Sequence, residues 1–581
     1  MFLVFKDMSW FFKKNWFKYV IVFVFTILFS FLLTLSPEII EDVVDLINNG
    51  LLTLKDIYKA SGFLLGLAIG IYLSAVIKNY LLGSLFHEFF YQIKVRFMNN
   101  IFRQDGDFFE EYYSGDLISR ATGDTHDVAR VSTYLLFALV DTTLTIFLSF
   151  FRMVEKDLGL TLLAIIPLPI IFVVVLIIRP KISANWRKVR KEISHLNNLV
   201  MESVANVKLV RGFNKEQEDY VKLEKSATTA FEIEKKSVLL RSVFSPIFNL
   251  VVLISQGVAL GYGSYLILNN SGFTVGQLIS FNMFLIMFSR PLFRLGNQIT
   301  FISQSGISAE RVSEILKAEP KINDCLGAIP LTDIKDVEFK DYSFHYPNEK
   351  TNIIEDINLV IKQGNTIGIV GKTGSGKSTL VKQLLRMYTI TGGKICINGK
   401  PINYYQKMSI RENISYIPQE NQLFSRTVLD NLLLGESKYS TFSIDDAIDM
   451  ADFRKDIPYL ENGLDTIVGE AGVTLSGGQK QRISIARAMY KNSEILIMDD
   501  ALSAVDGITE KNILKSIKDY RKDKTNIIIA HRLTAVESAD VIIVMDHGRI
   551  VEKGTHEELM SRKGWYYEQY IFQEMEDVSH D

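Results

Sequence analysis

The chain has 581 residues, a formal net charge of −2 and a hydrophobic content of 48%. That length exceeds one compact domain, and that hydrophobic content is high for a soluble protein. The balanced charge gives no basis for a nucleic-acid partner. The two cysteines, Cys325 and Cys396, are too few for a disulfide scaffold and argue against a cysteine zinc site.

Long apolar runs fill the first half of the chain, whereas the rest reads as soluble α/β sequence. A bilayer core of about 30 Å takes roughly 20 apolar residues in a helix. Six runs reach that length, which is rare in a soluble core, so we predict six membrane-spanning helices. Four of them cover 18–38, 59–78, 131–151 and 158–178, and the uncharged stretch 241–290 holds two more around a turn at 269–272.

Charge sets the predicted orientation. Lys6, Lys13, Lys14 and Lys18 precede the first span and an acidic segment follows it, which places the N-terminus in the cytoplasm. The charged segments 94–130 and 179–241 then lie on the cytoplasmic side. We expect membrane helices to continue through both, with turns inside 110–124 and 203–216.

From Asp336 onward, short β-branched strands alternate with glycines. The strand 365–370 leads into GKTGSGKST and then a helical segment, which is the GxxxxGKS phosphate loop in its strand–loop–helix context. Backbone N–H groups of such a loop surround a phosphate at a helix N-terminus, and the lysine reaches the β- and γ-phosphates. The residues predicted to contact ATP here are Gly371, Thr373, Gly374, Ser375, Gly376, Lys377, Ser378 and Thr379.

A second acidic element belongs at the end of a buried strand. The segment EILIMDD, 494–500, has four apolar residues followed by Asp499, at the strand end where ligands of open α/β sheets gather. We expect Asp499 and Ser378 to hold the Mg²⁺ ion that accompanies ATP.

The segment LSGGQKQRISIARA, 475–488, resembles the signature sequence of ABC transporters, and further motifs follow in that family's order. The resemblance makes Tyr346 the aromatic residue that stacks on adenine. It makes Gln419 the loop glutamine that touches Mg²⁺ and the membrane domain, and His531 the switch histidine at the γ-phosphate. It also assigns four signature residues to ATP, namely Ser476, Gly477, Gly478 and Gln479.

The resemblance covers the whole chain and is closest to exporters, whose membrane domain precedes the cassette. It implies a helical membrane domain of the exporter type fused to a cytoplasmic α/β P-loop cassette, with ATP hydrolysis coupled to transport. The implied organisation is a transmembrane domain at 1–318, a linker at 319–335, the cassette at 336–575 and a tail at 576–581.

One position departs from the family pattern. Most of these cassettes have glutamate after the metal-binding aspartate, where it serves the attacking water, and this chain has Asp500. The two side chains have similar pKa values but differ by one methylene, about 1.5 Å of reach. Since misplacing a catalytic group by about 1 Å can cost a hundredfold in rate, Asp500 is expected to be a poor catalytic base.

With its intact LSGGQ, the chain resembles the subunit of heterodimeric bacterial multidrug exporters that has a degenerate Walker B motif. The resemblance implies a non-identical partner half with a Walker B glutamate, a slow ATP site on this chain, and a multi-pass place in a bacterial plasma membrane. The alternative is a homodimer in which Asp500 works adequately.

The cargo expected from the resemblance is a small hydrophobic or amphipathic compound. Four residues are candidates for the substrate pathway: Asp141, Phe281, Phe284 and Phe288. An acid within an apolar span tends to face a cavity or a partner. The same residues equally suit ordinary helix packing. Export of lipids or peptides, or an ATP-gated channel or regulator, are the alternative functions.

Overall fold

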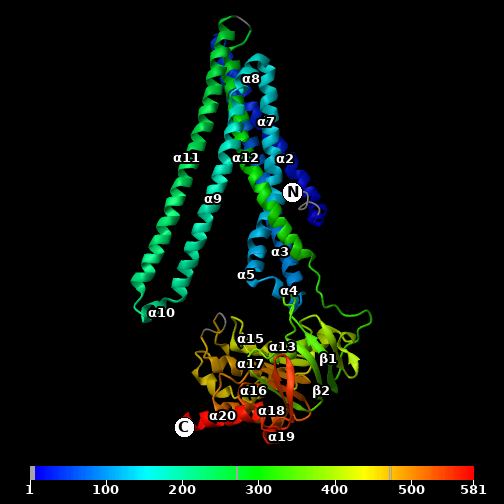
Figure 1. Ribbon diagram of the computed structural model, residues 1–581. Helices are drawn as coiled ribbons and strands as arrows, with labels where there is room; N and C mark the ends of the chain where they lie inside the picture. The colour runs from blue at the N-terminus through cyan, green and yellow to red at the C-terminus, as the bar shows by residue number, and fades with distance from the viewer. Residues whose placement is uncertain (1–6, 270–271, 470–471, 473, 581) are drawn as a thin grey trace. The chain divides into compact units, whose positions relative to one another are not determined.

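The computed structural model describes residues 7–269, 272–469, 472 and 474–580. Lys6 and the centre of the predicted turn at 269–272 therefore lie outside the described residues. The chain divides into two compact units, Met1–Asn100 with Ile118–Lys317, and Ile101–Leu117 with Ala318–Asp581. The first unit is helical, and the second combines two β-sheets with helices (Figure 1).

Long helices build the first unit. They are α2 (Ser9–Asn48), α3 (Leu54–Ile101), α7 (Leu136–Lys156), α8 (Leu158–Ile165), α9 (Leu168–Ala205), α11 (Glu216–Leu268) and α12 (Val275–Lys317). The segment before α7 is less regular: α5 (Ser114–Ser119) and α6 (Thr125–Arg130) alternate with the π-helical turns η1 (Arg120–Asp124) and η2 (Val131–Leu135). The hydroxyl of Tyr19 donates to the backbone carbonyl of Ser132 in η2, at 3.0 Å, which joins α2 to this irregular segment.

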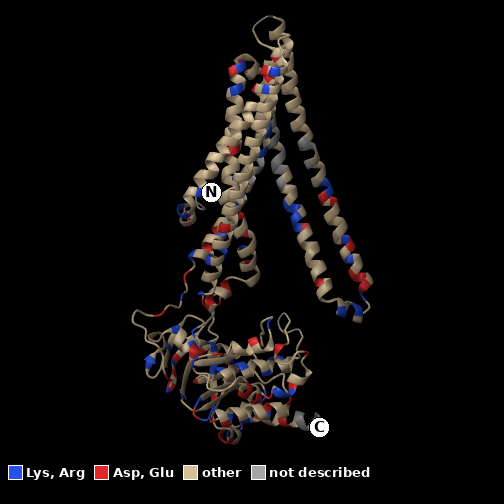
Figure 2. Cartoon of the chain, turned by 180° about the vertical axis from the view of Figure 1, so that it is seen from behind, with Lys and Arg blue, Asp and Glu red and all other residues tan. Residues whose placement is uncertain are grey.

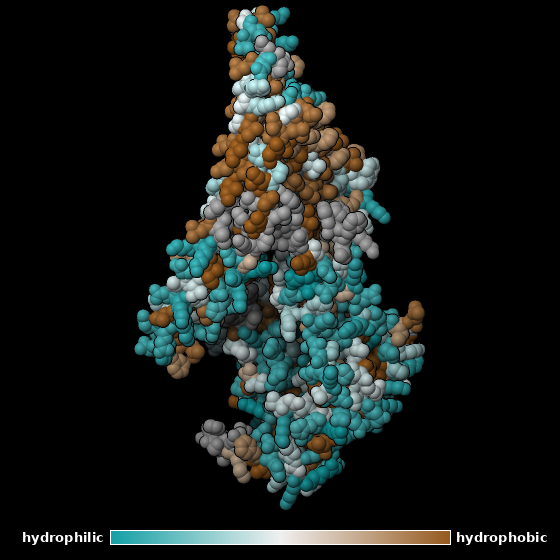
Figure 3. Space-filling model, turned by 45° about the horizontal axis from the view of Figure 1, so that its top comes forward, coloured by the Kyte–Doolittle hydropathy of each residue, from teal (hydrophilic) through white to brown (hydrophobic). Residues whose placement is uncertain are grey.

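Among the described residues, five helices are long and apolar enough to cross a membrane: Ser9–Asn48, Leu54–Ile101, Ser114–Lys156, Pro246–Leu268 and Val275–Leu295. The predicted span at 158–178 is instead broken, because α8 ends at Ile165 and α9 begins at Leu168. Pro167 between them lacks an N–H group and cannot continue the hydrogen-bond ladder. The six predicted spans thus correspond to these five helices and one kinked pair. Figure 3 shows hydrophobic residues gathered over this helical unit.

Both predicted turns fall inside the segments expected for them. A short helix, α10 (Val207–Gly212), joins α9 to α11 inside the predicted segment 203–216. The chain also turns at 112–113, between α4 (Gly106–Glu111) and α5, inside the predicted segment 110–124. Charged side chains are concentrated on the halves of α9 and α11 that end at α10 (Figure 2), as expected for helices that leave the bilayer.

Two sheets form the second unit. The smaller is antiparallel, in the order β2-β1-β4-β5. Its strands are β1 (Asp336–Phe344), β2 (Ile354–Lys362), β4 (Gly392–Ile397) and β5 (Lys400–Pro401). The larger has the order β10-β9-β3-β8-β7-β6, and all its pairs are parallel except β10 with β9. Its strands are β3 (Thr366–Gly371), β6 (Ile414–Ile417), β7 (Ile495–Asp499), β8 (Thr525–Ile529), β9 (Val541–Asp546) and β10 (Arg549–Gly554).

Both faces of the larger sheet are buried, which explains its apolar strands. Along β7, Leu496 and Met498 join one hydrophobic cluster, whereas Ile495 and Ile497 join another. Successive side chains of a strand point to opposite faces, so a continuous apolar run serves two layers. Each such side chain stabilises the fold by about 1.5–3 kcal/mol.

The helices of this unit are α13 (Lys377–Leu384), α14 (Lys407–Glu412), α15 (Val428–Leu433), α16 (Ile444–Met450), α17 (Gly477–Lys491), α18 (Gly507–Tyr520), α19 (His556–Arg562) and α20 (Trp565–His580). The two cysteines differ in environment. Cys396 on β4 is buried, and Cys325 is exposed in the irregular segment before β1.

Candidate ATP site

A cleft lies at the carboxyl ends of the parallel strands. It is lined by the loop and helix start at 373–379 after β3, by Gln419 beyond β6, by Asp499 and Asp500 at the end of β7, and by His531 after β8. Parallel strands all end at one edge of a sheet, so segments more than 100 residues apart meet there. The structure thus brings together most of the residues that the motifs singled out.

The loop after β3 depends on glycine at two positions. Gly371 has φ 143°, and a Cβ there would stand 2.1 Å from the carbonyl oxygen of Met545. Gly376 has φ 96° and forms the N-cap of α13. Side chains at either residue would be strained, because L-residues avoid this region of φ. The glycines therefore let the backbone curve tightly ahead of a helix N-terminus, as anion binding requires.

Lys377 is poised in this loop. Its Nζ donates to the carbonyl oxygens of Gly371 and Lys372, both at 2.8 Å. Burial lowers the pKa of Lys377, and the nearby carboxylates Asp499 and Asp500 oppose that shift. The Oγ of Ser375 is buried with no hydrogen-bond partner among the described residues. A buried hydroxyl without a partner is costly, so the cradle suits a phosphate oxygen.

Asp499 is oriented by two hydroxyl groups. Its Oδ1 accepts from Ser378 Oγ at 2.7 Å, and its Oδ2 accepts from the Tyr416 hydroxyl at 3.0 Å. A carboxylate, a hydroxyl and the amide of Gln419, all facing one cleft, are the oxygen ligands that Mg²⁺ prefers. The donor set therefore fits Mg²⁺, which would neutralise charge on the phosphates. Tyr416 was not among the predicted site residues, although it lies only three residues before Gln419.

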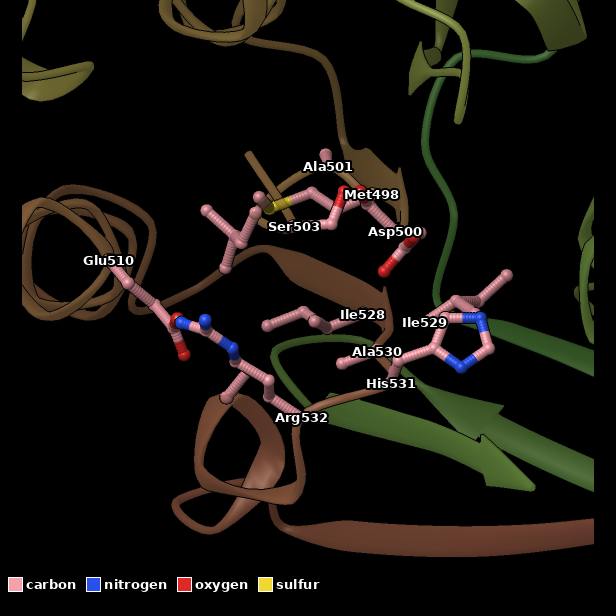
Figure 4. Close-up of a pocket in the computed structure, with 12 residues that line it drawn as sticks. Met498, Asp500, Ala501, Ser503, Glu510, Ile528, Ile529, Ala530, His531 and Arg532 are labelled. Atoms are coloured by element: carbon pink, nitrogen blue, oxygen red, sulfur yellow. Dashed lines mark hydrogen bonds and ion pairs between the residues drawn. The ribbon is translucent and has the colours of Figure 1, made fainter. Parts of the chain in front are cut away.

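Asp500 has an unusual backbone. Its φ of 51° lies in the left-handed region, which Asp and Asn tolerate better than longer side chains do. Its N–H donates to the carbonyl of Ile529 at 3.0 Å, and its carbonyl accepts from Ser503 Oγ at 3.1 Å. Burial raises the pKa of the Asp500 carboxyl, while His531 and Ser503 oppose the shift. Figure 4 shows Asp500 and His531 at the ends of neighbouring strands.

Tyr346 lies beside the cleft rather than in its lining. Its hydroxyl stands 3.2 Å from Thr379 Oγ1, and its ring packs edge-on against Phe344 and Tyr388, with centroids 5.2 and 5.1 Å away. These contacts fix the ring at the start of the phosphate-loop helix.

The signature residues 476–479 are not part of the cleft lining. Ser476 is the N-cap of α17, and its hydroxyl and the side chain of Gln479 form a capping box. Behind them Arg482 makes a bidentate pair with Asp456, at 2.6 and 2.7 Å, and both side chains are buried. Gly477 and Gly478 open the helix. This chain alone therefore does not assemble phosphate loop and signature in one site.

Breaking the buried pair should destabilise the cassette. Asp456→Ala leaves the guanidinium of Arg482 buried without its carboxylate, which typically costs about 3–5 kcal/mol. We expect a lower unfolding temperature for the full-length chain in detergent. Asp445→Ala is the matched control, because Asp445 pairs with Arg454 at an exposed site, where ion pairs contribute little. Equal losses for both variants would contradict the assignment.

The predicted substrate-pathway residues lie in the helical unit. Asp141 Oδ1 accepts from Ser30 Oγ at 2.9 Å, which joins α7 to α2. Phe281 and Phe284 are fully buried and Phe288 nearly so, in a hydrophobic cluster with residues of α7, α8 and α11. In this structure the three rings pack between helices of their own chain. Their place in a substrate pathway stays a prediction.

The segment 101–117 makes contacts that no sequence pattern predicted. Asp105 is almost fully buried, and its two carboxylate oxygens accept from Lys407 Nζ and from the backbone N–H of Ile322, both at 2.8 Å. Asp107 accepts from Thr389 Oγ1 at 2.6 Å. The N–H of Gly106 donates to the carbonyl of Met387 at 2.7 Å. The segment that follows α3 thus belongs to the second unit.

Both parts of the chain are similar to known protein families. Residues 19–292 match the family described as ABC transporter transmembrane region, and residues 354–503 match the family described as ABC transporter. A probable multidrug resistance ABC transporter ATP-binding/permease protein of Bacillus subtilis, YheI, is 37% identical, over 99% of this chain and 98% of that protein. An ATP-dependent lipid A-core flippase of Syntrophus aciditrophicus is 32% identical, over 84% and 80%.

A solved structure is similar along nearly its whole length. It is a bacterial Atm1-family ABC exporter with ATP bound. The match covers 96% of this chain and 99% of that chain, with a TM-score of 0.81 and 26% sequence identity. Fold, phosphate loop and relatives agree. The chain belongs to the ABC transporter family, as an exporter that fuses a membrane domain to an ATP-binding cassette and couples ATP hydrolysis to transport.

Proposed function

We propose that the chain is one half of a heterodimeric exporter of hydrophobic or amphipathic compounds, and that its own ATP site is the slow one of two. The observation that carries the proposal is Asp500 next to an intact signature. Asp500 places its carboxylate about 1.5 Å short of a glutamate. The signature at 476–479 lies outside the chain's own cleft, which leaves it available to a second chain.

Each ATP would be held between the phosphate loop of one half and the signature of the other. On this chain Lys377 would bind the β- and γ-phosphates, Tyr346 would stack on adenine, and Ser378, Gln419 and Asp499 would hold Mg²⁺. Asp500 would orient the attacking water poorly, and His531 would contact the γ-phosphate. Ser476 to Gln479 would complete the faster site, whose phosphate loop and glutamate belong to the partner.

We place the transmembrane domain at 1–318, the linker at 319–335, the cassette at 336–575 and the tail at 576–581. The N-terminus and the cassette would face the cytoplasm of a bacterial cell, with the helical unit in the plasma membrane. Basic residues ahead of α2 and charged extensions on α9 and α11 support that orientation.

Co-expression tests the proposal. The chain is purified alone and together with a candidate half that has glutamate after its Walker B aspartate, and phosphate release is measured in lipid vesicles. We expect slow turnover by the chain alone and fast turnover by the pair. Asp500→Asn in this chain should leave most of the ATP hydrolysis rate of the co-expressed pair. Fast turnover by the isolated chain that Asp500→Asn abolishes would instead establish a homodimer.

Relatives named as lipid A-core flippases favour a second cargo class, a lipid. ATP-dependent uptake into inverted vesicles separates the two classes. A cationic dye that accumulates supports export of amphipathic compounds, and transfer of a labelled lipid between leaflets supports lipid export. Single-channel conductance without uptake of either would indicate a gated channel instead.

A further inference from the structure

The C-terminal helix α20 reaches back to the segment that follows β8. Gln573 on α20 makes two hydrogen bonds there. Its Oε1 accepts from the backbone N–H of Leu533 at 2.8 Å, and its Nε2 donates to the backbone carbonyl of His531 at 2.9 Å. A side-chain amide suits this position because it is a donor and an acceptor at once. One side chain thus holds the backbone on both sides of Arg532.

The helix that carries Gln573 is itself fixed to the core. Tyr566 is fully buried in one of the two large hydrophobic clusters of the unit. The N–H of Trp565 donates to Glu552 Oε1 at 2.6 Å, and the Tyr566 hydroxyl stands 3.0 Å from His556 Nδ1. The N-terminal part of α20 is therefore anchored on β10 and α19. Gln573 extends from that anchor two turns further along the helix.

The segment held by Gln573 borders open space. A pocket of about 130 Å³ lies beside it, lined by Asp500, Ser503, Glu510, His531 and Arg532 among others (Figure 4). Arg532 Nη1 stands 3.4 Å from the carboxylate of Glu510 on α18, which gives the segment a second, longer attachment. Without the Gln573 contacts, the backbone at His531 has room to shift into this pocket. A tether is needed because packing alone does not fill the space.

We infer that Gln573 is a positioning residue for His531: its amide holds the switch segment so that the imidazole stands at the phosphate cleft. This rests on the role of His531 in the proposed function. His531 lines the cleft just after the end of β8. The backbone carbonyl of His531 itself accepts the hydrogen bond from Gln573. Since a shift of about 1 Å in a catalytic group can cost a hundredfold, a loosened segment should slow hydrolysis.

The test uses the full-length chain in its active assembly. The parent is either the native chain or Asp500→Glu, whichever hydrolyses ATP faster at this site. The partner's glutamate, or that of the second copy, is replaced by glutamine so that this site is measured alone. Gln573→Met keeps the length of the side chain and removes both hydrogen bonds. We expect kcat to fall about tenfold while KM for ATP changes less than twofold, because the phosphate loop is untouched.

Three further measurements separate positioning from general stability. Gln573→Glu keeps an acceptor for the Leu533 N–H and loses the donor to His531, so its kcat should be intermediate. Glu574→Gln, at an exposed position one residue along, should match the parent. Hydrogen exchange should accelerate at the Leu533 amide in Gln573→Met and not in Glu574→Gln.

Combining Gln573→Met with His531→Ala gives the decisive comparison. If Gln573 acts through His531, the second substitution should add nothing once the imidazole is gone. A further tenfold loss in the His531→Ala background would overturn the inference. So would an unchanged kcat in Gln573→Met. A failure of the proposed function is detected by a different experiment, which compares ATP hydrolysis by the unsubstituted chain with and without a partner.

Discussion

Asp500→Glu should raise the rate of ATP hydrolysis at this chain's own site about tenfold to a hundredfold. The extra methylene returns about 1.5 Å of reach, and a misplacement of about 1 Å accounts for up to a hundredfold in rate. The carboxylate gained stands at the end of β7 beside His531 and across the cleft from Lys377. In the proposed function, Lys377, Asp499 and His531 of the same cleft supply the other groups that phosphoryl transfer uses.

In the proposed heterodimer, the measurement is phosphate release with the partner's glutamate changed to glutamine, so that only this site turns over. Asp500→Asn is the control and should be slower than the parent. Glutamate fits the left-handed backbone at this position less well than aspartate, at a cost of about 1 kcal/mol. A small drop in unfolding temperature should therefore accompany the gain in rate. An unchanged rate in a folded variant would show that reach does not limit this site.

Asp105→Ala should reduce transport far more than ATP hydrolysis. The change removes the carboxylate that accepts from Lys407 Nζ and from the Ile322 N–H. Lys407 Nζ keeps its hydrogen bond to the carbonyl of Ile322 but loses its counter-charge. Losing one member of a buried ion pair costs about 3 kcal/mol or more. The contacts of Asp107 and Gly106 remain, so the segment 101–117 should loosen within the second unit rather than detach.

A loosened attachment should transmit less of the cassette's movement to the helices while the ATP cleft stays intact. The ratio of substrate moved to ATP hydrolysed, measured in the same vesicles, should fall at least fivefold. Glu111→Gln, an exposed position on α4, serves as the control and should keep the parent ratio. If uptake and hydrolysis fall by the same factor, Asp105 supports folding rather than coupling.

The residues of the ATP cleft could be predicted because local patterns mark them. A glycine-rich loop between an apolar strand and a helix, and an aspartate that ends another apolar strand, both place polar groups at the same sheet edge. Gln419, Asp499 and His531 stand at the ends of parallel strands for that reason. Roles within the cleft are a separate matter, and those stay proposals.

Contacts between distant segments could not be predicted. Asp105 pairs with Lys407, 302 residues further along, and neither stands in a motif. Gln573 reaches the segment after β8 from a helix whose sequence shows only ordinary amphipathic character. Which residues pair across such separations depends on the tertiary fold. Short-range sequence periodicity predicts local structure and does not predict these pairs.

One apolar pattern can serve two structures. The apolar run 158–178 is long enough for a span, and Pro167 kinks the helix within it. Phe281, Phe284 and Phe288 recur at the spacing of one helix face. That spacing suits a buried stripe as well as a cavity wall, and the structure buries them.

The exposed Cys325 gives the protein a practical property. Its thiol is accessible, whereas the other cysteine, Cys396, is buried in a strand. A maleimide fluorophore should therefore attach to the native chain at a single position, in the segment that leads from the helical unit into the first strand of the cassette. Changes in that segment during a transport cycle can then be followed by fluorescence without engineering a cysteine-free background.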